Sequence, residues 1–142
     1  MGRGRTSLIS SLMPVLAGLA GCAGAAPIAQ PVTIERPAFG GEAQFRGHLG
    51  KRNGCIVAVG GSQVSTVLFD PDVRLLDNGE GIFDPATRQS IVFGQAVTGG
   101  AAFLRERGRG WPISDIETFF GVSLPRGCPV GHIMRLHDLV TE

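Results

Sequence analysis

The fold is decided by the stretch Cys55-Ile56-Val57-Ala58-Val59, a short apolar run rich in β-branched residues. A run of this length with no polar side predicts a β-strand that is buried on both faces and lies centrally in a sheet. After a loop at residues 60–63, the residues from Val64 to Phe69 alternate between two faces and are rich in β-branched types, which predicts a second strand. These two stretches favour a β protein.

Turn residues separate further short apolar runs on both sides of this pair. Asn53-Gly54 supplies the positive φ angles of a tight hairpin, and Asp77-Asn78-Gly79 marks a second turn of this kind. Gly99-Gly100 predicts a bulge or a sharp coil of the sheet. The remaining strands are expected at residues 45–49, 73–76, 81–83, 90–93, 95–104 and 133–140. The pattern predicts an all-β, mainly antiparallel fold, a small closed or nearly closed barrel of the OB or SH3-like kind.

One short helix is expected late in the chain, after residues 105–110 break the β pattern. Ser114-Asp115-Ile116-Glu117 fits a capping box, in which the Ser114 hydroxyl accepts from the Glu117 amide and the Glu117 carboxylate accepts from the Ser114 amide. Ile113, Phe119 and Phe120 extend an apolar stripe, and Gly121 stands where a left-handed residue ends a helix. So short a helix needs the barrel to stabilise it.

The N-terminal region has the features of a secretory signal. Arg3 and Arg5 precede an apolar run from Leu8 to Leu19, and two small residues follow it. This run is too short and too glycine-rich to span a membrane, which takes about 20 mostly apolar residues. The segment ends at a cysteine, and Leu19-Ala20-Gly21-Cys22 resembles the lipobox of bacterial lipoproteins.

This resemblance implies diacylglycerol on the Cys22 sulfur, cleavage before Cys22 by the lipoprotein signal peptidase, and acylation of the new amino terminus. The alternative is an ordinary signal with a chance cysteine. Two or three acyl chains hold a protein on a bilayer far more firmly than one chain does. Ala23 follows the cysteine, and the absence of an aspartate there favours the outer membrane, on its periplasmic face, in an organism that has one.

Removal of residues 1–21 leaves 121 residues, enough for one domain and too few for two. Residues 22–43 are rich in Ala, Gly, Pro and Gln and predict a lipidated, flexible tether, to which Val32 and Ile34 add at most an edge strand. A single domain is then expected at residues 44–142. Two of the 13 basic residues leave with the signal, so the mature net charge is −1, which argues against a nucleic-acid partner.

The other two cysteines form an even pair. With Cys22 committed to lipid, Cys55 and Cys128 remain in an oxidising compartment, where pairing is the default, so we expect a disulfide between them. The alternative is a reactive thiol, which neither a neighbouring base nor a Cys-x-x-Cys partner supports.

Residues that would carry catalysis or a metal are sparse. His132 and His137 are five positions apart, so in a strand they point to opposite faces and share no ion without a bulge, and His48 is the only other histidine. Ser62 lacks the second glycine of a nucleophile elbow. The carboxylates of residues 70–72 lie in an expected turn, which explains them better than acid–base catalysis does. The sequence predicts no catalytic residue, no metal and no cofactor.

The best candidate site is the group Arg105, Arg107, Arg109 and Trp111, which contains the single tryptophan of the chain. Arginine and tryptophan are the residue types that anchor interfaces, and the same group can rest on anionic headgroups. In the alternative, Trp111 covers the barrel and the arginines are solvated. We expect a membrane-anchored binding or adaptor module for an envelope protein or a cell-wall glycan. An enzyme acting on an envelope substrate and a purely structural spacer are the alternatives.

Overall fold

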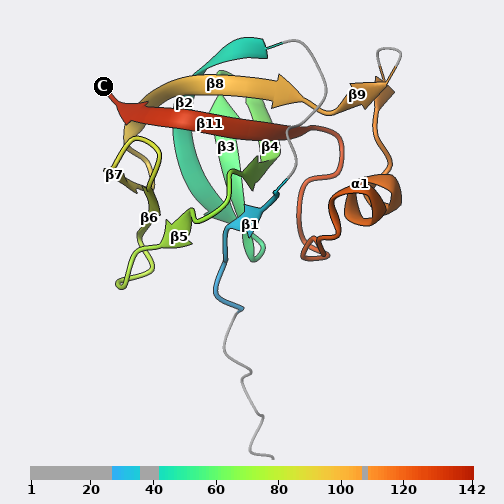
Figure 1. The fold of residues 1–142 in the computed structure, drawn as a ribbon, viewed down its shortest axis with the longest axis horizontal. Coiled ribbons are helices and arrows are strands. Elements are labelled where there is room, and N and C mark those ends of the chain that lie inside the picture. The colour runs from blue at the N-terminus through green and yellow to red at the C-terminus, as the bar shows by residue number, and fades with distance from the viewer. Residues whose placement is uncertain (1–26, 36–41, 107–108) are drawn as a thin grey trace, which may run out of the picture.

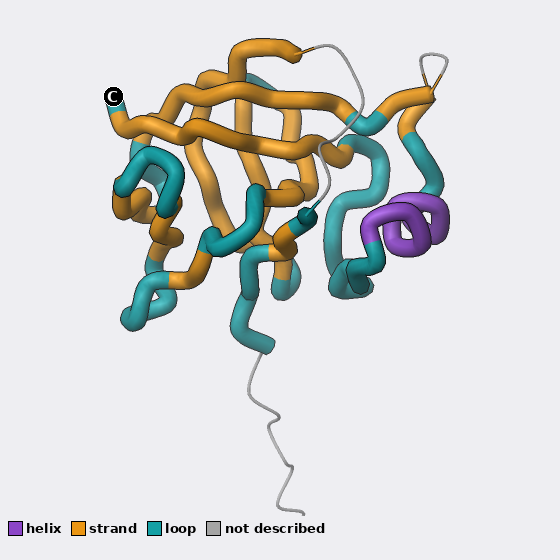
Figure 2. Tube along the Cα trace, viewed as in Figure 1, coloured by secondary structure: helices purple, strands orange, loops and turns teal. Residues whose placement is uncertain are grey.

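Five strands close into a barrel in the computed structural model, which describes residues 27–35, 42–106 and 109–142 (Figures 1 and 2). The order around the barrel is β4-β11-β8-β2-β3, and β3 pairs with β4 to close it. The strands are β2 (Glu42–Arg52), β3 (Cys55–Gly60), β4 (Gln63–Phe69), β8 (Ala96–Phe103) and β11 (Ile133–Thr141). The predicted all-β, mainly antiparallel fold with one short helix is confirmed.

The pairing directions distinguish between the two barrel types expected. β4 and β11 are parallel, with Ile133 opposite Thr66 and Leu136 opposite Phe69, whereas the other barrel pairs are antiparallel. A barrel whose third and last strands are parallel neighbours has the strand order of an OB fold, and an SH3-like barrel does not.

The stretch that led to the fold prediction forms β3, whose first four residues are all buried. Ile56 and Ala58 face the barrel core, while Cys55 and Val57 face outward and are covered by Cys128. Neither face of β3 is therefore solvated along its first four residues, which agrees with its apolar sequence. The preceding turn has positive φ at both of its central residues, Asn53-Gly54.

A small three-stranded antiparallel sheet follows β4 and covers part of the barrel core. It consists of β5 (Arg74–Leu75), β6 (Gly81–Asp84) and β7 (Gln89–Val92), and its Ile82 and Ile91 are fully buried in the main core. The Asp84 carboxylate is 3% exposed and accepts from the amides of Ala86 and Leu139, so it ties this sheet to β11.

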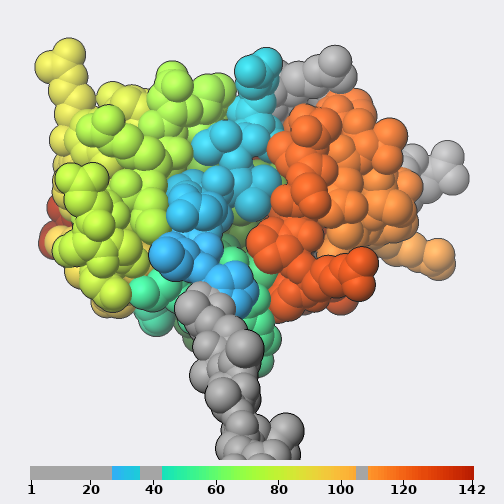
Figure 3. All heavy atoms as spheres, turned by 90° about the horizontal axis from the view of Figure 1, so that it is seen from below, coloured from blue at the N-terminus to red at the C-terminus, as the bar shows by residue number. Residues whose placement is uncertain are grey.

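The N-terminal segment is part of the domain over residues 27–35, so the tether expected at 22–43 is wrong for this part. β1 (Val32–Thr33) pairs in parallel with the end of β4, as the possible edge strand predicted, and Ile34 is 2% exposed. Ala29 is also buried, and the Ile34 amide bonds to the Phe69 carbonyl, so this segment packs on the domain despite its small residues and prolines. Figure 3 shows it lying between the region that follows β4 and the loop that follows the helix. Residues 22–26 and 36–41 lie outside the described residues.

Residues 104–132 form an insertion between β8 and β11. It begins with a hairpin of β9 (Arg105–Glu106) and β10 (Arg109–Gly110), so the expectation that residues 105–110 leave the β pattern is wrong. The helix α1 (Ile113–Phe120) follows (Figure 1). Its apolar side packs in a second core, with Ile34, Leu68, Leu104, Ile116, Leu124 and Ile133.

The capping box predicted for α1 does not form. Pro112 is the N-cap, and the amides of Asp115 and Ile116 bond to its carbonyl, so Ser114 lies inside the first turn. The fixed φ of proline suits this position, and the helix therefore starts before the serine. The Glu117 carboxylate instead accepts from the Leu124 amide at 2.7 Å. The predicted C-terminal residue is confirmed, because Gly121 has a φ of 66°.

The expected disulfide joins Cys55 to Cys128, with 5.4 Å between their Cα atoms. It fixes the start of β3 to the last part of the insertion. In the part of the chain that the structure describes, no helix has both the length and the apolar character needed to cross a bilayer.

Candidate binding surface

Three of the four predicted residues, Arg105, Arg109 and Trp111, lie on or next to one hairpin. Arg105 lies on β9 opposite Gly110, and Arg109 lies on β10 with an exposed side chain. Trp111 directly follows β10, and its amide bonds to the Leu104 carbonyl at 3.2 Å, which closes the base of the hairpin. Arg107 lies outside the described residues.

Leu104 fixes this hairpin to the barrel. Its side chain is 2% exposed in the second core, and its amide bonds to the carbonyl of Ile133 at the start of β11. The hairpin is therefore held at its base by both backbone and side-chain contacts, and β9 lies beyond the end of β8 (Figure 1). In the sequence, the only sign that Leu104 anchors the hairpin is its place at the end of the apolar run of residues 95–104.

Trp111 is half-buried beside the helix. Its ring meets Phe119 edge to face at 5.4 Å, and Phe119 meets Phe120 edge to face at 4.9 Å, so the three rings form one aromatic row. Such contacts stabilise the row beyond the area that it buries. The indole Nε1 is buried, and no described residue accepts a hydrogen bond from it. Trp111 is thus partly a packing residue, as the alternative supposed.

An apolar groove lies against the exposed side of Trp111. Its volume is about 530 Å³. It is lined by Gly110, Trp111, Pro112, Ile113, Val130 and Gly131. Val130 is 64% exposed, one of the most exposed large apolar side chains in the described chain. The sequence did not indicate Val130, because the loop before β11 has no pattern that connects it to the hairpin.

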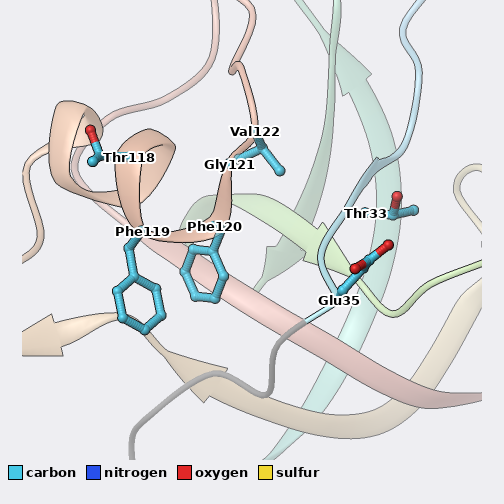
Figure 4. A pocket seen from close by; sticks show the side chains of 7 residues that line it. All are labelled: Thr33, Glu35, Thr118, Phe119, Phe120, Gly121 and Val122. Atoms are coloured by element: carbon cyan, nitrogen blue, oxygen red, sulfur yellow. The ribbon is translucent and has the colours of Figure 1, made fainter.

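A second cavity lies at the other end of the aromatic row, below α1 (Figure 4). Its volume is about 540 Å³. The rings of Phe119 and Phe120 form one wall, and Thr33 and Glu35 from the N-terminal segment form the other. Phe119 therefore contacts Trp111 near the first groove and also lines the second cavity, so the row joins the two.

The three histidines occupy separate places on the barrel. His48 lies on β2 opposite Val59, and His132 is exposed before β11. His137 bonds to the neighbouring Asp138 at 2.8 Å, and its Nε2 is buried without a partner among the described residues. The described residues contain no group of three His, Cys, Asp or Glu side chains that would hold a metal ion.

A bulge in β11 sets the place of His137. Asp138 has a φ of 51°, and the register with β8 shifts after His137. The irregularity expected at Gly99-Gly100 of β8 therefore lies in the neighbouring strand β11. Gly99 and Gly100 have no side chains, which leaves space for the bulged residues. A Cβ built on Gly100 would stand 2.2 Å from the His137 Cε1.

The other groups considered for catalysis do not gather at a site. Ser62 is exposed in the turn between β3 and β4. Asp70 pairs with Arg135 of β11, Oδ1 to Nη2, at 2.6 Å, so it is an ion-pair partner as well as a turn residue. Asp72 is exposed with a φ of 68°.

Comparison with known proteins adds no identity to this geometry. No protein-family model, no curated protein and no solved structure matches the chain.

Proposed function

We propose that this chain is a bacterial envelope lipoprotein, held on the membrane by lipid on Cys22, whose β domain acts as a binding adaptor. The observation that carries the proposal is the apolar groove between Trp111 and Val130. The exposed Arg109 directly precedes Gly110, which lines this groove, and tryptophan and arginine are residue types that dominate binding energy at interfaces.

The chemistry of the groove favours a protein partner over a glycan. Its walls come from Trp111, Pro112, Ile113 and Val130, which offer apolar surface for an aliphatic or aromatic side chain. A glycan needs several hydrogen-bonding side chains around its ring, and the groove offers few.

The disulfide supports the proposed compartment. Paired cysteines are typical of the periplasm and other oxidising compartments and are rare in a reducing cytosol. A signal followed by Leu19-Ala20-Gly21-Cys22 requires the same compartment. We place the protein on the periplasmic face of the outer membrane where the organism has one.

Photo-crosslinking in intact envelopes tests the adaptor proposal. p-Benzoylphenylalanine at Val130, expressed at the native level, is expected to give one discrete adduct. Trp111→Ala and Arg109→Ala should each lower its yield, and Val130→Asp in a chain that carries the probe at Ile113 should abolish it. Val92 is 49% exposed on β7, so Val92→Asp is the matched control and should leave the adduct unchanged.

The nature of the adduct separates the alternatives. Protease sensitivity indicates a protein partner, and sensitivity to a peptidoglycan hydrolase indicates a glycan. A yield that survives Val130→Asp contradicts the groove as the site. If no discrete adduct forms, the adaptor proposal is contradicted and the spacer and enzyme alternatives remain. An enzyme would then be tested for with small-molecule envelope substrates.

A further inference from the structure

The chain joins the domain at a surface that carries exposed apolar and cationic side chains. Pro27 and Ile28 lie beside the turn between β2 and β3, and Ile28 is 72% exposed. The hollow around them, about 310 Å³, is also lined by Lys51, Arg52, Asn53, Gly54, Asn78, Gly79 and Glu80. An isoleucine this exposed has no packing role in the domain.

Two unpaired arginines stand on this surface. Arg52 ends β2, and Arg126 is exposed on the loop whose Gly127 lies against Asn53, so both lie around the same turn. Neither arginine has an ion-pair partner among the described residues. Lys51 is different, because its Nζ lies 3.0 Å from the Glu80 carboxylate and is neutralised by it.

The charge of the surface is therefore positive. Arg52 and Arg126 contribute two free cations, and the Lys51–Glu80 pair contributes none. Asp77, on the same turn as Asn78 and Gly79, lines a neighbouring hollow together with Arg74.

The length of the tether places this surface at the membrane. Cys22 precedes Pro27 by five residues, and a fully extended chain covers at most about 3.6 Å per residue. An acylated Cys22 therefore keeps Pro27 within about 18 Å of the lipid headgroups. No other surface is bound to the bilayer by so short a connection.

We infer that this surface, formed by Pro27, Ile28, Arg52 and Arg126, rests on the bilayer and binds anionic phospholipid headgroups. Ile28 enters the interface between headgroups and acyl chains, and the two guanidinium groups bind phosphate oxygens. The inference rests on the proposed lipid anchor and adds an orientation to it. In Figure 1 the chain joins the domain at the lower side and β9 lies at the upper side, so the hairpin faces away from the membrane.

Lipid photo-crosslinking of the acylated protein tests this orientation. The mature protein is placed in vesicles of phosphatidylethanolamine and phosphatidylglycerol, with p-benzoylphenylalanine at Ile28 or, as the control, at Val92. We expect lipid adducts from the Ile28 probe and at least about tenfold fewer from the Val92 probe. Arg52→Gln with Arg126→Gln should lower the ratio of docked to undocked domain by about 30-fold. Each basic residue near an anionic surface contributes about 1 kcal/mol, and the two contributions add.

Two arginines outside this surface control for the loss of two formal positive charges. Arg46 lies six residues earlier on β2 and pairs with Glu142 at 3.1 Å, and Arg88 is exposed in the turn between β6 and β7. Arg46→Gln with Arg88→Gln should leave the Ile28 adducts unchanged. Equal adduct yields from the Ile28 and Val92 probes in protein that floats with the vesicles would overturn the orientation and leave the anchor intact. Protein that does not float with the vesicles would refute the anchor and the orientation together.

Discussion

Loss of the Cys55–Cys128 disulfide should lower the free energy of unfolding by about 4 kcal/mol. The two cysteines are separated by 73 positions, and chain-entropy arithmetic for a loop of that length gives this value at 25 °C. It is a large share of the roughly 5–15 kcal/mol that stabilises a typical domain. Both cysteines are at most 5% exposed, so Cys55→Ala with Cys128→Ala also avoids leaving a buried lone thiol.

Urea unfolding of the detergent-extracted protein, followed by circular dichroism, measures the change. With an m-value of about 1–2 kcal/mol/M, the midpoint should fall by about 2–4 M. The m-value should rise, because an uncrosslinked denatured chain is more expanded.

Reduction of the natural protein provides the control for packing. The reduced protein and the double variant should agree within about 1 kcal/mol, because both release the same loop. A double variant as stable as the oxidised protein would refute the entropy argument. A variant that is destabilised while the reduced protein is not would assign the loss to packing against Val57, Val59 and Val64, the neighbours of the disulfide.

Three further substitutions test packing and hydrogen bonding in the barrel and in the insertion. Ile116→Ala should cost about 2–5 kcal/mol in urea unfolding, because this side chain is fully buried at the centre of the second core. Gly100→Ala should cost about 1–3 kcal/mol, because the new methyl meets the His137 ring, and His137→Ala should recover most of the loss in a double-mutant cycle. Asp84→Ala should cost about 1–3 kcal/mol, because it leaves the buried Leu139 amide without its acceptor.

Two of these substitutions, Ile116→Ala and Gly100→Ala, have a neutral counterpart in the same chain. Ser114→Ala on the exposed side of α1 should change stability by less than about 0.5 kcal/mol, because no cap depends on its hydroxyl. A Cβ on Gly50 meets one atom at 4.0 Å, so Gly50→Ala should be nearly neutral. A Ser114→Ala loss as large as that of Ile116→Ala would contradict the assignment of Pro112 as the cap.

The individual strands could be predicted because each depends on its own residues. The apolar run at Cys55–Val59 and the Asn53-Gly54 turn specify a buried strand and its hairpin without help from the rest of the chain. The disulfide followed from cysteine count and compartment alone.

The closure of the barrel depends on partners that are distant in sequence. The parallel pairing of Ile133 with Thr66 joins residues far apart in the chain, and no local pattern records it. The capping box predicted for the start of α1 was wrong because it, too, depends on contacts outside the local pattern. Ser114 and Glu117 have capping-box spacing, but Glu117 binds the Leu124 amide across the following loop, and Pro112 already provides the helix start.

The candidate site was predicted in part. Arg109 and Trp111 were indicated because their residue types are typical of interfaces, but Val130 shares the groove only through the fold. The exposed position of Val130 could not be predicted from the sequence, because the loop before β11 lies next to the hairpin only in the folded insertion.

The insertion decides which surface of this barrel is available for binding. OB barrels bind ligands over the outer face of their second and third strands, which here are β3 and β4. On that face Val57 is 3% exposed, Thr66 is 1% exposed under the Pro129 carbonyl, and Leu68 is fully buried in the second core. The disulfide at Cys128 fastens the covering loop. The proposed partner site therefore lies on the outside of the insertion, at Trp111 and its groove, and the fold alone does not imply the function.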